Sequence, residues 1–254
     1  MADAAEFYVG YLRMPTRLAA FLRWVAAGLL LATAAIGWSL SRSQNDPGDG
    51  VWQDGLQTFV GRVAAAPYPL IRVPSDRPGK PIETILLVSQ GKHGAAERIA
   101  GLDGRIARVR GTILERDGVR LLELTESGAA ALDESLGPVE QARLATPSVA
   151  PLGTVTFYGE IIDPKCYSGA MKPGEGKTHK ACATLCIAGG IPPMFVAFDA
   201  AGRRSVYLLT DPHGRALDDR ILPYVADPVE IIAALERCDD LYVLRLDPEC
   251  IRRR

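Results

Sequence analysis

The residues whose types and spacing suit chemistry gather in one segment, DPKCYSGAMKPGEGKTHKACATLCIAGGIPP, at positions 163–193. It holds three of the five cysteines and one of the three histidines of the 254-residue chain. Thiolate sulfur and imidazole nitrogen are the ligands that zinc and other transition metals prefer. The same thiols can also pair as a disulfide, or one of them can stay free as a reactive group.

The spacing of the last three residues favours convergence on one ligand. His179, Cys182 and Cys186 stand at i, i+3 and i+7, so a helix would carry them along one face, and the glycines at 189 and 190 would end that helix. Cys166 needs only to fold back across the Gly- and Pro-rich turn to complete a Cys₃His set, which is a zinc composition. We therefore predict a site for zinc or another transition metal at Cys166, His179, Cys182 and Cys186. The spacing matches no CxxC knuckle, and the identity of the metal stays unknown.

Two other interpretations of the segment remain open. In an oxidising compartment, Cys166 can pair with Cys182 or Cys186 and staple the segment to the fold. Alternatively, Lys177 and Lys180 flank His179 and favour a reactive thiolate at a neighbouring cysteine.

Cys238 and Cys250 bracket the last strand-like run, and a disulfide between them would tie the C-terminus to the preceding turn. The chain contains no CxxCH sequence, so covalent c-type haem is not expected. No Ser-His-Asp set and no paired carboxylates stand out, which leans against an enzyme. The formal net charge of −1 argues against a nucleic-acid partner.

A membrane helix is predicted at residues 18–41, where an apolar stretch is long enough to span a bilayer. Its uncharged part is residues 24–40; three arginines precede that part, whereas only Arg42 follows it closely. By the positive-inside rule, the N-terminus lies in the cytoplasm and the rest of the chain in the periplasm, anchored once in the inner membrane. A cleaved signal peptide is the alternative, but the end of the span lacks a small-x-small cleavage signal. The arginines before the uncharged part are Arg13, Arg17 and Arg23, with Arg23 inside the span near its start.

Gly28 and Ala32 form a small-xxx-small pair within this span. Such a pair lets a second helix approach closely, although small residues are also common in membrane spans without that role. The partners that this predicts are integral membrane subunits, besides lipid and extracytoplasmic proteins.

The rest of the chain repeats one plan, in which three short β runs, a short helix and two further β runs follow each other. This order resembles the five-stranded OB-type barrel, and it occurs in residues 56–135 and again in 153–254. The chain is thus predicted to be mainly β, with two small OB-like barrels after the helix. The segment 163–193 stands between the first two strands of the second barrel, a loop that commonly carries ligand contacts. The remaining segments are a cytoplasmic tail at 1–17 and linkers at 42–55 and 136–152.

A single anchor followed by a small extracytoplasmic barrel is similar in layout to the periplasmic haem chaperone family of cytochrome c maturation. The haem-attachment histidine and tyrosine motif of that family is not visible here, so haem chaperoning is not implied. We expect a non-catalytic accessory subunit of a membrane complex, respiratory or otherwise redox. The alternative is a metal-binding or thiol-redox protein that acts through the Cys/His segment.

Overall fold

The computed structural model describes residues 10, 14–43, 50–77, 79–131, 136–199 and 201–254. The predicted segments 1–17 and 42–55 lie partly outside these residues. Arg13 lies outside them. Within the described part, one helix is long and apolar enough to cross a membrane, α1 (Thr16–Ser43). It encloses the predicted span 18–41, and at about 1.5 Å per residue it is longer than the roughly 30 Å core of a bilayer.

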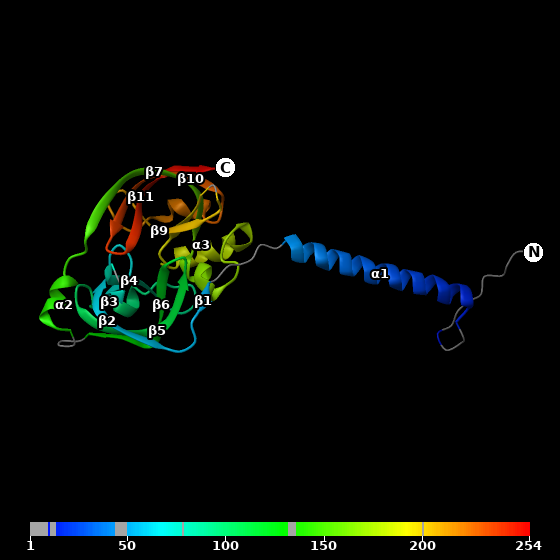
Figure 1. Cartoon of the computed structure of the whole chain (residues 1–254), viewed down its shortest axis with the longest axis horizontal. Coiled ribbons are helices and arrows are strands. Elements are labelled where there is room, and N and C mark those ends of the chain that lie inside the picture. The colour runs from blue at the N-terminus through cyan, green and yellow to red at the C-terminus, as the bar shows by residue number, and fades with distance from the viewer. Residues whose placement is uncertain (1–9, 11–13, 44–49, 78, 132–135, 200) are drawn as a thin grey trace, which may run out of the picture. The chain divides into compact units, whose positions relative to one another are not determined.

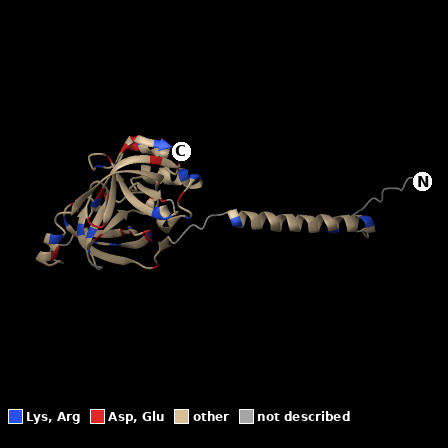
Figure 2. Cartoon of the chain, turned by 45° about the horizontal axis from the view of Figure 1, so that its top comes forward, with Lys and Arg blue, Asp and Glu red and all other residues tan. Residues whose placement is uncertain are grey.

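Figure 2 shows charged residues at the ends of α1 and few between them. None of its described residues is buried. A Cβ on Gly28 would meet nothing within 4 Å. The helix packing expected of Gly28 and Ala32 stays a prediction.

The first barrel closes through five strands (Figure 1). β2 pairs antiparallel with β3 and β5, β3 with β4, and β5 with β6, whereas β4 and β6 run parallel. Asp117 and Gly118 form the tight turn between β5 and β6, both with positive φ. The strands are β2 (Gln57–Ala64), β3 (Leu70–Arg77), β4 (Lys80–Val88), β5 (Ile106–Arg116) and β6 (Val119–Ala131), and the short β1 (Val51–Trp52) adds to β5.

The second barrel has the same pairing order. β7 pairs antiparallel with β8 and β10, β8 with β9, and β10 with β11, and the parallel contact joins β9 to β11. The repeated OB-type plan is therefore confirmed, including the short helical turn before the fourth strand of each barrel. The strands are β7 (Val149–Ile162), β8 (Met194–Phe198), β9 (Arg204–Thr210), β10 (Val229–Cys238) and β11 (Leu241–Arg253), and the two turns are η1 (Glu97–Ile99) and η4 (Asp219–Tyr224).

Two local features refine the sequence interpretation. Asp218 caps η4, since its side chain accepts a hydrogen bond from the Arg220 amide. The segment 136–152 contains a short helix, α2 (Pro138–Arg143), and the first residues of β7.

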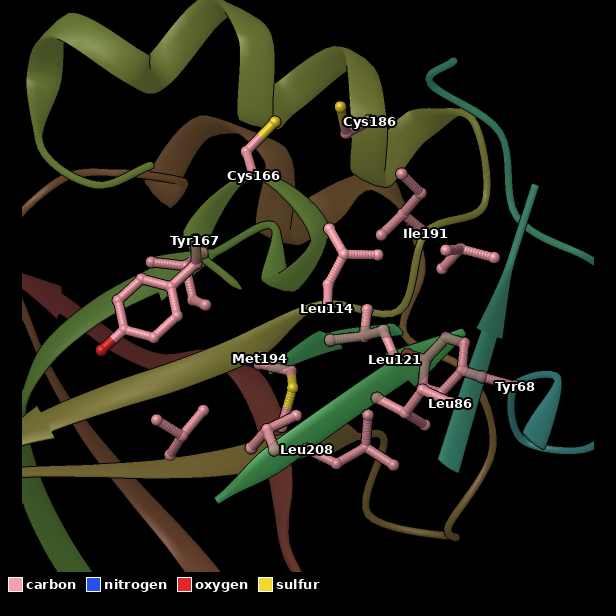
Figure 3. Close-up of a cluster of buried hydrophobic side chains, with 14 of the residues drawn as sticks. Tyr68, Leu86, Leu114, Leu121, Cys166, Tyr167, Cys186, Ile191, Met194 and Leu208 are labelled. Atoms are coloured by element: carbon pink, nitrogen blue, oxygen red, sulfur yellow. The ribbon is translucent and has the colours of Figure 1, made fainter. Parts of the chain in front are cut away.

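The two barrels share a hydrophobic core, and residues 47–254 form one compact unit. Leucines of the first barrel meet side chains of β8 and β9 and of the segment 163–193 (Figure 3). Burial of this apolar surface between the barrels fixes where the segment lies. The labelled members of this cluster include Leu86, Leu114, Leu121, Tyr167, Ile191, Met194 and Leu208.

Glycines bring the segment 163–193 into backbone contact with the first barrel. The Gly94 amide, just after β4, donates a hydrogen bond to the Gly189 carbonyl at 2.9 Å. A Cβ on Gly94 would overlap the carbonyl oxygen of Gly190, and one on Gly189 would overlap that of Lys92. Only residues without a side chain permit this approach.

Replacing Gly94 with alanine should therefore destabilise the compact unit by about 1–3 kcal/mol, the usual cost of overpacking. Urea unfolding of the full chain in detergent, followed by near-ultraviolet circular dichroism, measures the change. Gly137→Ala is the matched control, because Gly137 has φ −63° and its added Cβ would meet nothing nearer than 3.9 Å. Equal unfolding midpoints for the two variants would contradict the close contact.

Candidate metal centre

The predicted ligands come from the loop between β7 and β8, as the sequence indicated. Cys166 begins a short π-type turn, η2 (Cys166–Ala170), directly after β7. His179 ends the turn η3 (Lys177–His179), and α3 (Lys180–Ala188) carries Cys182 and Cys186. The helix ends at the predicted glycines, with Gly189 as its C-cap.

The four predicted ligands come together as two triads that share one cysteine. The ligand atoms of Cys166, His179 and Cys182 lie within 4.8 Å of one another. Cys166 and Cys186 form a second such triad with Asp163, which the sequence interpretation had not included. The Sγ atoms of Cys166 and Cys182 are 3.9 Å apart, and the Met171 Sδ lies 3.6 Å from the Cys182 Sγ.

Two polar atoms in the cluster are buried without a hydrogen-bond partner. His179 is 5% exposed and its Nε2 has no partner, while Asp163 is fully buried and its Oδ2 has none. The other oxygen of Asp163 accepts a hydrogen bond from the Lys165 amide at 2.9 Å. Because an unpaired buried polar group costs roughly 1–3 kcal/mol, such atoms call for a ligand.

The protonation states of the cluster suit metal binding. Burial lowers the pKa of His179, so its imidazole is neutral near pH 7, the form that ligates metals. A hydrogen bond with Cys166 lowers the pKa of Cys186 against the opposing effect of burial. The same bond, together with burial and the nearby Asp163, raises the pKa of Cys166. Cys186 is thus the thiol of this pair that loses its proton first.

Lys92 brings a positive charge to the cluster from the first barrel. It lies between β4 and η1, and its Nζ stands 2.6 Å from the Cys182 Sγ and 3.8 Å from the Cys186 Sγ. The hydrogen bond to Cys182 raises the pKa of Lys92. The ammonium group therefore stays charged and offsets negative charge on the thiolates.

Lys165 fixes the start of the segment to the first barrel. Its buried ammonium forms an ion pair with Glu123 and donates to the carbonyls of Ser89 and Gly91 at 2.8 and 2.7 Å. All three partners lie on the first barrel: Glu123 on β6, and Ser89 and Gly91 in the loop after β4 that also carries Lys92. The ion pair thus holds Asp163 and Cys166 in place beside Lys92.

Tyr167 makes a second anchor. Its hydroxyl donates to Asp117 at 2.5 Å, and the Arg116 guanidinium stacks 3.9 Å from the centre of its ring. Arg116 also donates to the Tyr167 carbonyl at 3.0 Å. The residue next to Cys166 is therefore fixed to the β5–β6 turn.

The structure forms none of the disulfides that the sequence left open, since all five cysteines are free. The 3.9 Å between the sulfurs of Cys166 and Cys182 is nearly twice the roughly 2.05 Å of a disulfide bond. Strand register keeps apart the two cysteines of the expected Cys238–Cys250 bridge. Cys238 pairs with Leu241 at the hairpin turn, whereas Ile251, next to Cys250, pairs with Ile231 near the other end. A bridge needs Cα atoms within about 7 Å, which this separation excludes.

Lys180 does not support the reactive-thiol interpretation. Its Nζ pairs with Asp227 at 2.7 Å and donates to the Pro223 carbonyl, on the η4 side of α3. Lys92 takes the place at the thiols that the sequence suggested for Lys177 or Lys180.

Sequence reasoning could have found Asp163, a carboxylate three positions before Cys166. It had no signal to link Lys92 to Cys182.

The chain matches no family model and no curated protein. Among solved structures, the crystal structure of the tetrameric p202 HIN2 is similar over 83% of this chain and 98% of its own, with 7% sequence identity and a TM-score of 0.24. A similarity this low says nothing about function. The OB-type assignment of both barrels rests on their strand order and closure.

Proposed function

We propose that this chain is a membrane-anchored metal-binding protein whose Cys/His segment holds a transition-metal ion on the periplasmic side of the inner membrane. The observation that carries the proposal is the triad of Cys166, His179 and Cys182 with its buried, unpartnered imidazole nitrogen. Sulfurs bound at about 2.3 Å to one tetrahedral ion lie roughly 3.8 Å apart. The two sulfurs of the triad lie 3.9 Å apart, which fits that geometry.

The donor set favours a soft or borderline ion. Thiolates select zinc, Cu(I) and iron–sulfur centres, and a thioether such as Met171 adds to that preference. Cys186 and Lys92 complete the surroundings of the triad, the first as a further thiolate and the second as a counter-charge. Zinc is the first ion to test, because Cys₃His is one of its structural sets.

Purified from reducing buffer, the full chain should contain metal, and its three cluster thiols should react with a thiol reagent only after a chelator is added. Cys182→Ser should remove a ligand and weaken binding. Loss of a residue that only orients a ligand costs roughly 10–100-fold in affinity, so loss of Cys182 should cost more. Elemental analysis and zinc–chelator competition measure both effects.

Cys250→Ser is the matched control, since Cys250 is also a free cysteine but lies in the last strand, outside both triads. Metal binding that is equal in the two variants would overturn the proposal. Cluster thiols that react fully without a chelator, in a chain free of metal, would favour the thiol-redox alternative instead.

The membrane topology is the second part of the proposal. The length and hydropathy of α1 support a single span, and the arginines at and before its N-terminal end favour a cytoplasmic N-terminus. A reporter that is active only outside the cytoplasm, fused after Arg254, should therefore be active. An inactive fusion at normal expression, with the same reporter active on a known periplasmic protein, would refute this topology.

An accessory role in a respiratory or other redox complex is a second candidate. It is favoured by apolar side chains that stand exposed on β7 and on its neighbour β10, namely Val149, Leu152, Tyr158 and Ile232. If a partner covers this face, extraction in mild detergent should recover the chain with integral membrane subunits in fixed proportion. Leu152→Asp should break that association while leaving metal content unchanged. A chain that always migrates alone would contradict the accessory role.

A further inference from the structure

The second triad is not needed for a single metal ion, yet it has the composition of a metal site of its own. Asp163, Cys166 and Cys186 place a carboxylate oxygen and two sulfurs within 4.8 Å of one another. All three residues are buried, and the Oδ2 of Asp163 has no hydrogen-bond partner. A fully buried carboxylate with a free oxygen is costly unless a cation meets it.

Cys166 belongs to both triads, and its thiolate has electron pairs for more than one metal. We infer that the loaded site holds two transition-metal ions bridged by the Cys166 sulfur. One ion is bound by Cys166, His179 and Cys182, and the other by Cys166, Cys186 and Asp163. Each ion then has three protein ligands and an open position, the pattern of zinc sites that exchange a ligand. The inference rests on the proposed function and specifies its stoichiometry.

The two ammonium groups near the cluster have other partners. Lys92 donates to the Cys182 Sγ, and the ammonium of Lys165 pairs with Glu123 and donates to two backbone carbonyls. The buried Oδ2 of Asp163 therefore has no counter-charge among the described contacts, and a metal ion at the second triad would supply one.

Cobalt titration of the full chain in detergent, stripped of metal by a chelator under reducing conditions, tests the inference. Co²⁺ is the probe because its thiolate charge-transfer bands count bound ions and its unpaired electrons report on bridging. We expect two equivalents of Co²⁺ per chain. As the second equivalent binds, the paramagnetic resonance signal per cobalt should fall, because the shared Cys166 sulfur couples the two spins.

Asp163→Asn keeps the oxygen that accepts from the Lys165 amide but removes the charged ligand, so it should bind one equivalent without coupling. Cys186→Ser should do the same and serves if the first variant does not fold. Cys250→Ser should keep both equivalents. Wild-type chain that binds one equivalent would overturn the inference and leave the proposed function intact, whereas no binding would overturn both. Two uncoupled equivalents, or two equivalents in Asp163→Asn, would overturn the shared-thiolate site.

Discussion

Everything in the candidate site depends on the burial of one loop between two barrels. The segment 163–193 leaves β7 and returns to β8 of the second barrel, but its apolar side chains enter a core shared with the first barrel. The glycine contacts at 94 and 189 bring the backbones together, and Lys165 fixes the loop by an ion pair. Burial removes water from the polar atoms and sulfurs of this loop. Buried polar atoms without a hydrogen-bond partner, such as the Asp163 Oδ2 and the His179 Nε2, are then costly unless they bind a ligand.

This arrangement explains why a repeated fold carries one site. Both barrels share the same strand order, but only the second has a long loop between its first two strands. The first barrel contributes the wall against which the loop packs, together with the charge of Lys92. The pair of barrels therefore supplies a buried surface for the site, and both belong to one compact unit.

The proposed metal centre combines soft ligands with a restricted route for exchange. Cys166, Cys186, His179 and Asp163 are buried, whereas Cys182 and Met171 lie nearer the surface. An ion would enter past these two sulfurs and beside the ammonium of Lys92.

The sequence by itself determined the apolar span at 18–41, the two five-stranded barrels and the loop that holds Cys166, His179, Cys182 and Cys186, because hydropathy, turn residues and periodicity are local signals. It did not determine the sharing of Cys166 between two triads, the addition of Asp163, or the separation of Cys238 from Cys250. Those depend on strand register and on how the loop turns after β7. Lys92 reaches Cys182 only because the two barrels pack closely through glycine contacts and a shared core. Contacts between residues so far apart in the chain leave no periodic trace, so tertiary packing alone decided them.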